Sequence, residues 1–249
     1  MKHIHSVKNP QVKEWKKLLS KKDRDKTGTF LVEGFHLVEE AFKAEAILDL
    51  IISEEVDLPG WDYGDLPVKI VTKEIMAQLT ETETPQGIVA VCKQMEDASI
   101  VYSGKTFVVL DKVQDPGNLG TIIRTADAAG IDAVVIGEGT VDIYNPKVVR
   151  SAQGSHFHLP IIKQKIPSFI DALKEKNIPV FGTSLENGKD YREMKREQEG
   201  FCLIVGNEGS GVSKEVLVKT DANLYIPIYG KSESLNVAVA AGILLYHFN

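Results

Sequence analysis

The chain has 249 residues, of which 43% are hydrophobic, so it is long enough to bury one large core or two modest ones. The formal net charge is −6, which excludes a strongly basic surface over the whole chain of the kind that binds nucleic acid nonspecifically. The N-terminus lacks the apolar stretch of a signal peptide and no apolar run reaches the roughly 18 residues of a membrane span, so we expect a soluble, cytoplasmic protein without a membrane partner.

The charge is unevenly distributed along the chain. Residues 1–26 contain nine Lys or Arg against three Asp or Glu, whereas the rest of the chain contains 20 against 32. A basic segment on an acidic body is typical of proteins that hold an anionic polymer. A solvated basic helix would have the same composition, so charge alone leaves both interpretations open.

The residue types that bind metal ions are scattered. Cys92 and Cys202 lie in apolar runs, as small core residues do. His156 and His158 flank Phe157, but no cysteine or carboxylate cluster accompanies them at ligand spacing. We therefore expect structural roles for these side chains and no metal site.

The first part of the chain alternates between strand-like and helix-like patterns, which predicts a small α/β domain over residues 1–92. Asn9 and Pro10 suit the start of a helix. One apolar face of that helix is formed by Val12, Trp15, Leu18 and Leu19. The remaining predicted elements are a helix after Gly34, a helix over 73–79 and strands over 29–32, 48–53, 68–71 and 87–91.

Residues 93–104 are polar and irregular, and we predict a linker there, followed by a second domain over residues 105–249. The alternation restarts in this domain with almost wholly apolar strands, which predicts a parallel sheet covered by helices on both faces. Ligands of such sheets bind at the carboxyl ends of the strands. The predicted strands are 107–110, 133–136, 159–162, one from 180, 203–205 and 224–228; the helices lie before Gly130, from 145 to about 153, over 166–173 and over 237–246.

A polar loop and a helix start follow the first strand of the second domain. Asn118 stands at the helix start and Arg124 six residues later. Six residues turn a helix by about 600°, so the side chains lie about 120° apart, yet both could reach one ligand beyond the helix N-terminus. Helix N-termini favour phosphate groups. A capped helix with a surface arginine is the plainer alternative.

Two further loops follow apolar strands near the C-terminus. The turn 206–211 lacks both the Gly-Lys-Ser/Thr ending of a P-loop and the glycine spacing of a dinucleotide-binding turn, and it could simply join a strand to a helix. Pro227 within an apolar run indicates a strand edge or a sharp exit. Ser234 could serve only as the cap of the next helix. That helix is apolar nearly all round, so it must be buried in the core or against another subunit.

Together, three segments resemble the three motifs of the SpoU (TrmH-like) RNA ribose methyltransferases, in the order of that family. The resemblance covers about residues 105–247. Residues 30–34 and 84–87 resemble the substrate-binding domain of many members, which is similar in fold to small RNA-binding ribosomal proteins. The motif segments are Asn118-Leu119-Gly120 with Arg124, Gly206-Asn207-Glu208-Gly209, and Ile226-Pro227-Ile228 with Ser234-Leu235-Asn236.

The resemblance implies a SPOUT fold, in which the parallel α/β sheet ends in a trefoil knot that binds S-adenosylmethionine. It also implies a homodimer through the C-terminal knot domain. The implied reaction is methyl transfer to a ribose 2′-OH of structured RNA, gripped by the basic segment and the N-terminal domain. Large-subunit (23S-type) ribosomal RNA is the favoured substrate and transfer RNA the alternative; the target nucleotide is left open.

The resemblance further implies roles for individual residues. Polar side chains around the reacting groups are Asn118, Arg124, Glu208, Ser234 and Asn236, and backbone and apolar contacts to the cofactor come from Gly206, Ile226, Ile228 and Leu235. The family role of a base is awkward for Arg124, because a guanidinium holds its proton tightly. We favour a clamp on the target phosphate, with the partner subunit as one source of this arginine, and a loop-ordering role for Glu208.

Two other functions stay open at this point. An RNA-binding protein with the same fold and no catalysis would bind RNA but not S-adenosylmethionine. A nucleotide-dependent α/β enzyme such as an oxidoreductase would bind a dinucleotide, which the glycine pattern of the 206–211 turn disfavours. A cofactor-binding assay separates the methyltransferase from the non-catalytic RNA-binding protein.

Overall fold

The computed structural model describes residues 1–95, 103–186, 188–195 and 200–249. The chain divides into two units, Met1–Met95 with Asp142–Phe157 and Glu96–Val141 with His158–Asn249. The predicted linker at 93–104 lies largely outside the described residues. The predicted boundary at residue 105 does not account for residues 142–157, which join the first unit because helix α7 (Pro146–Ala152) packs on strand β2 (Thr29–Glu33).

The first unit is built on a five-stranded mixed sheet with the strand order β1-β4-β3-β5-β2. Strands β1, β3 and β4 run parallel, whereas β5 is antiparallel to both of its neighbours. The strand β1 was not predicted, because only Ile4 in its three residues is buried and no alternation can show. Besides β2, the strands are β1 (Lys2–Ile4), β3 (Ile47–Ser53), β4 (Val68–Val71) and β5 (Ile88–Lys93).

The helices of the first unit bury the faces that their periodicity predicts, with one interruption. The apolar face that begins at Val12 does not form one helix, since α1 ends at Lys17 and α2 starts at Lys21. The carbonyl groups of Leu18 and Leu19, freed between the helices, accept hydrogen bonds from Arg24. The helices are α1 (Pro10–Lys17), α2 (Lys21–Thr27), α3 (Phe35–Lys43), α4 (Lys73–Leu79), α7 and the 3₁₀ helix η1 (Ser155–Phe157).

The basic N-terminal segment is part of this folded unit. Val12, Trp15 and Leu18 belong to a hydrophobic cluster with α4 and the sheet. The guanidinium of Arg24, 3% exposed, forms an ion pair of 2.6 Å with Asp142. This ion pair holds segment 142–157 on the N-terminal helices. Removal of either partner would leave the other charge without a counter-charge.

The second unit contains a seven-stranded sheet with the order β10-β12-β9-β11-β6-β7-β8, in which every pairing is parallel. This confirms the predicted fold class. The strands are β6 (Thr106–Asp111), β7 (Ala133–Ile136), β8 (Ile161–Lys163), β9 (Val180–Thr183), β10 (Lys189–Asp190), β11 (Phe201–Gly206) and β12 (Ala222–Tyr225). The helices are α6 (Pro116–Ala128), α8 (Ile166–Glu175), η2 (Tyr191–Glu193), α9 (Lys214–Leu217) and α10 (Val237–Phe248).

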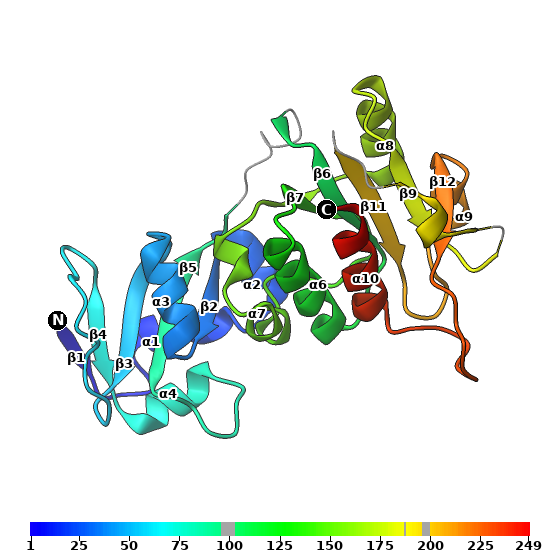
Figure 1. The fold of residues 1–249 in the computed structure, drawn as a ribbon. Coiled ribbons are helices and arrows are strands. Elements are labelled where there is room, and N and C mark those ends of the chain that lie inside the picture. The colour runs from blue at the N-terminus through cyan, green and yellow to red at the C-terminus, as the bar shows by residue number, and fades with distance from the viewer. Residues whose placement is uncertain (96–102, 187, 196–199) are drawn as a thin grey trace. The chain divides into compact units, whose positions relative to one another are not determined.

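Successive strand residues face opposite helical layers. Phe107 of β6 packs edge-on against Phe169 of α8, at 5.3 Å between ring centroids. On the other face, Phe248 of α10 stacks on Phe181 and contacts Phe201. Figure 1 shows α10 beside α6, in agreement with their direct contact. None of the helices within the described residues is long and apolar enough to cross a membrane.

Candidate active site

The site is built where β6 and β11 end side by side. The two strands pair in register up to Asp111 and Gly206, so the loops that follow them start next to each other. The buried carboxylate of Asp111 accepts a hydrogen bond of 2.7 Å from the backbone N–H of Ser213. A Cβ at Gly206 would lie 2.1 Å from the carbonyl carbon of Gly211, so only glycine lets the 206–211 turn fold back this closely.

Asn207 ties this turn to the loop after β6. Its side-chain oxygen accepts hydrogen bonds from the backbone N–H groups of Gly209 and Ser210, at 2.9 and 3.0 Å. Its side-chain nitrogen donates to the carbonyl oxygen of Lys112 at 2.9 Å. Lys112 has φ 59°, a left-handed conformation that non-glycine residues rarely adopt and that turns its carbonyl to this partner.

A chain of polar side chains joins all three motif segments. The carboxylate of Glu208 accepts hydrogen bonds from the backbone N–H groups of Gln114 and Asp115, at 3.2 and 3.0 Å, and from Nδ2 of Asn118 at 3.0 Å. Nδ2 of Asn236 donates to Oδ1 of Asn118 at 2.8 Å. Asn118 is therefore held from both sides, and its amide orientation is fixed by one acceptor and one donor.

Glu208 is held as a carboxylate. Partial burial works to raise its pKa, but hydrogen bonds from the Asn118 side chain and from the backbone N–H groups of Glu208, Asp115 and Gln114 outweigh it. The pKa of Glu208 therefore lies below the ordinary carboxyl value. At neutral pH the site presents a fixed negative charge at the N-terminal end of α6.

The cap of α10 is Asn236. Its Oδ1 accepts hydrogen bonds from the backbone N–H groups of Ala238 and Val239. The alternative in which Ser234 caps this helix is therefore wrong, because the helix begins too far along the chain for Ser234 to reach its first turn. The carbonyl oxygen of Ser234 accepts a hydrogen bond from Ser232 instead.

The other predicted site residues are placed less tightly. Arg124 is exposed on α6, and none of the described residues accepts a hydrogen bond from its guanidinium. Ser234 is exposed, and Leu235 is 38% exposed. Ile226 and Ile228 are half-buried in the segment that follows β12. The structure thus joins Asn118, Glu208 and Asn236 by hydrogen bonds, whereas it leaves Arg124 and Ser234 outside that chain.

Three supporting residues were not predicted. Asp111 and Asn207 hold the two loops, and Asp115 caps α6 by accepting from the N–H of Asn118. The Asp-Pro pair at 115–116 is a helix-start signal that would have revealed the cap. Nothing local marks Asp111, since its partner Ser213 lies about a hundred positions away in the sequence. Asn207 has the local partners Gly209 and Ser210, which are typical of an asparagine turn, but its bond to Lys112 spans nearly as great a separation.

The histidines and cysteines take structural positions. His156 is buried and its Nε2 bonds to the carbonyl oxygen of Ile143, while burial lowers its pKa to about 4. Both cysteines are buried, which raises the pKa of each thiol.

One unpredicted group, His36 with Glu39 and Glu40, brings metal-ligating atoms within 4.8 Å of one another. Lys43 already pairs with both of its carboxylates.

A family model described as the SpoU rRNA Methylase family matches residues 105–246, which is more than half of the chain. The chain belongs to the SpoU rRNA methylase family. This confirms the predicted family. A second model, described as the MRM3-like substrate binding domain, matches residues 9–90. The SpoU match includes residues 142–157, which fold with the first unit.

Relatives of the SpoU family match over nearly the full length. The chain is 52% identical over 248 residues to the 23S rRNA (guanosine(2553)-2′-O)-methyltransferase RlmP of Bacillus subtilis, covering 99% of each chain. An AdoMet-bound rRNA methyltransferase from Sinorhizobium meliloti superposes with a TM-score of 0.88 at 32% identity, over 98% of this chain and 96% of that one. The SpoU methyltransferase AviRb from Streptomyces viridochromogenes, with AdoMet, gives 0.84 at 27% identity, over 96% and 97%.

Proposed function

We propose that this chain transfers a methyl group from S-adenosylmethionine to a ribose 2′-OH of 23S-type ribosomal RNA, at the nucleotide corresponding to guanosine 2553. The observation that carries the proposal is the hydrogen-bonded chain Glu208–Asn118–Asn236, which unites the three motif segments at the strand ends. The relative named for this reaction is 52% identical over nearly the whole chain. The predicted enzyme class and cofactor agree with the methyltransferase and AdoMet-bound relatives.

The residues at these strand ends suit the cofactor. Gly206 and the closely folded turn after it offer backbone groups without a side chain in the way. Ile226 and Ile228 offer half-buried apolar surface, and Leu235 adds exposed apolar surface. We propose that these four residues hold S-adenosylmethionine, which when bound supplies the electrophilic methyl group.

The polar side chains have different tasks in this proposal. Glu208 already accepts three hydrogen bonds, so it orders the loop after β6. Asn118 and Asn236 hold each other at the mouth of the site, where Ser234 adds an exposed hydroxyl. Arg124, whose guanidinium keeps its proton, clamps the target phosphate and so aligns the ribose hydroxyl for in-line attack. By positioning the reacting groups in this way, the protein itself lowers the barrier to methyl transfer.

We propose that the enzyme is a homodimer through α6 and α10. The helix α10 is apolar nearly all round, yet Val239 and Tyr246 on one face are 52% and 63% exposed. An apolar helix face of this kind is usually buried against another subunit. Arg124 is exposed on the adjoining helix, so a partner docked there places its own arginine near this site.

Analytical ultracentrifugation of Val239→Asp tests the dimer. A buried, unpaired carboxylate at the interface should convert the dimer to monomer. The control is Val218→Asp, since Val218 is 82% exposed just after α9, belongs to neither helix of the proposed interface, and should leave the dimer intact. A wild-type chain that sediments as a monomer would refute the proposed assembly.

We also propose the trefoil knot. The strand β11 is inserted between β6 and β9, both of which precede it in the sequence, and the chain then returns as α10 against α6. Such an insertion followed by a return is what threading through a loop requires, although knots are rare exceptions among folds. A crystal structure whose trace straightens when its ends are pulled would refute the knot.

The first unit is proposed to grip the RNA. Lysines 13, 16, 22 and 26 are exposed. The family model that matches residues 9–90 is described as a substrate binding domain. Deleting residues 1–26 would unfold this unit, because Val12, Trp15 and Leu18 belong to its core. Reversing Lys13 and Lys22 to Glu is the appropriate test, and it should weaken RNA binding and flatten its salt dependence. An unchanged salt dependence would exclude the segment from the contact.

The reaction itself is tested with purified protein, S-adenosylmethionine and 23S rRNA transcribed in vitro from the Bacillus subtilis gene. Mapping of 2′-O-methyl groups should find one modified nucleotide, at guanosine 2553. Methylation of transfer RNA but not of the 23S transcript would show that transfer RNA is the substrate. Binding of RNA without binding of S-adenosylmethionine would show a non-catalytic protein. Because its substrate is part of the ribosome, we place the enzyme in the cytoplasm.

A further inference from the structure

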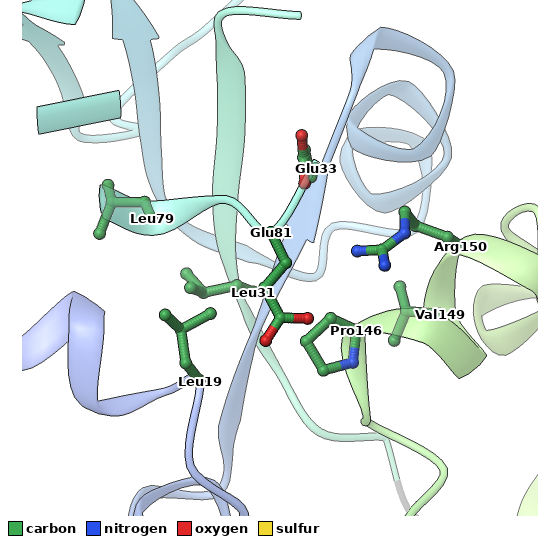
Figure 2. Close-up of a pocket in the computed structure, with 8 residues that line it drawn as sticks. All are labelled: Leu19, Leu31, Glu33, Leu79, Glu81, Pro146, Val149 and Arg150. Atoms are coloured by element: carbon green, nitrogen blue, oxygen red, sulfur yellow. The ribbon is translucent and has the colours of Figure 1, made fainter. Parts of the chain in front are cut away.

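Two adjoining hollows open in the first unit, and none of their lining residues belongs to the three motif segments. They share Glu33, at the end of β2, and Arg150, on α7. The smaller hollow has an apolar floor made by leucines of the N-terminal segment and the sheet and by residues of α7. Figure 2 shows Glu81 and the guanidinium of Arg150 extending into the space between β2 and α7. The lining residues are Leu19, Leu31, Glu33, Leu79, Glu81, Pro146, Val149 and Arg150.

The larger hollow has a volume of about 170 Å³ and a lining that mixes polar and apolar surface. This is several times the roughly 30 Å³ that one water occupies, and it suits a single planar ring system rather than a whole cofactor. Hydroxyl, amide and imidazole groups line it, and these can donate and accept hydrogen bonds at the edge of a base. They belong to Thr82, Thr84, Gln86, His36 and Gln153.

A hydrogen bond to the start of α3 positions one wall of this hollow. Gln86 Oε1 accepts a hydrogen bond from the backbone N–H of Phe35 at 3.0 Å. The same oxygen lies 3.1 Å from the place of a Cβ on Gly34, whose φ of +96° favours glycine. Because Gln86 Nε2 donates to none of the described residues, it is left as a donor at the hollow. Thr82 donates to Glu33 and fixes the other end of this loop.

The opposite wall comes from a distant part of the chain. Arg150 and Gln153 lie in and just after α7, within the SpoU-matched region but packed in the first unit. No carboxylate among the described residues lies within ion-pair distance of the Arg150 guanidinium. The backbone of Gln153 is left-handed, with φ 51°, and ends α7 beside the hollow. A positive charge and a polar amide thus face the loop that holds Gln86.

We propose that this hollow receives one unstacked base of the RNA substrate, with Gln86 and Gln153 at the base edge and Arg150 on the adjacent phosphate. Sequence-specific proteins read RNA through bases splayed out of the stack, using hydrogen bonds to their edges, and arginine binds the phosphate. The inference rests on the proposed function, because it takes RNA as the substrate. It assigns part of RNA recognition to α7, a segment of the methylase-matched region.

Steady-state methyl transfer to the 23S transcript tests the proposal with Gln86→Ala and Arg150→Ala. Loss of one base contact should raise the KM for RNA roughly five- to a hundred-fold, with kcat and S-adenosylmethionine affinity unchanged, because the contact is the same before and during the reaction. Lys147→Ala removes a charge from the exposed side of the same helix and is the matched control. Arg150→Lys should recover part of the affinity, since it keeps the charge.

Ultraviolet crosslinking of the wild-type protein to the same transcript supplies an independent readout. A crosslinked nucleotide should map to the peptides around residues 33–37 or 82–87. The proposed base-binding role of the hollow would be refuted if Gln86→Ala and Arg150→Ala had the same KM for RNA as Lys147→Ala, or if crosslinks mapped only outside these peptides. In either case, methylation by the wild type would leave the proposed function standing. Crosslinks at these peptides without any methyl transfer by the wild type would support the base-binding hollow and refute the proposed function.

Discussion

Replacing Glu208 with Gln should loosen the loop after β6, although the two side chains have nearly the same size and shape. The carboxylate accepts three hydrogen bonds, two at Oε1 and one at Oε2. A glutamine has one oxygen, so its amide nitrogen would face the N–H of Gln114 or of Asp115. The charge that strengthens the remaining bonds would also be lost.

The size of the effect follows from those three bonds. Bonds to a charged group contribute about 1.5–3 kcal/mol and neutral ones about 0.5–1.5 kcal/mol. Since Glu208 is exposed, we discount the summed difference by about half, which leaves a loss of roughly 2 kcal/mol. If the ordered loop is needed in the transition state, kcat/KM should fall by roughly thirty-fold.

The assay combines initial rates of methyl transfer with calorimetric titration of S-adenosylmethionine. Glu215→Gln, an exposed glutamate on α9, is the matched control and should behave as the wild type. Because the pKa of Glu208 is depressed, its stabilisation is present above the ordinary carboxyl pKa and is lost as the pH falls through the depressed value. Normal turnover and normal cofactor affinity in Glu208→Gln would limit this carboxylate to packing and refute the reasoning.

Three further predictions concern single side chains. Arg124→Lys keeps the charge but loses the planar fork, so methyl transfer should fall by more than about ten-fold at unchanged cofactor affinity; a wild-type rate would exclude the clamp. His156 stays neutral when folded, so the free energy of unfolding should fall by up to about 1.4 kcal/mol per pH unit from roughly pH 6.5 towards its folded pKa of about 4. Urea titrations of His156→Gln should lack that slope, and an identical slope would contradict the assignment. Arg24→Leu should cost about 3–5 kcal/mol of stability, because Asp142 loses its charge partner. Arg24→Leu with Asp142→Leu should recover part of that loss, since the carbonyl groups of Leu18 and Leu19 still lack their donor. Equal losses in both variants would contradict the unpaired charge as a cause.

The sequence by itself determined the class of fold and the family. Apolar periodicity is a local property, so the strands at 68–71 and 133–136 and the helix at 73–79 could be located from their own residues. The order of the three motifs likewise sufficed for the SpoU family. The apolar character of α10 predicted a helix that must be covered.

The tertiary structure decided which of these residues meet. The register of β6 against β11 brings Glu208 to Asn118, and the return of the chain brings Asn236 to the same place. The Arg24–Asp142 pair and the transfer of residues 142–157 to the first unit depend on contacts across more than a hundred positions. Side-chain periodicity records which face of an element is buried, but it does not record which distant element covers that face, and for that reason no local pattern could have shown these contacts.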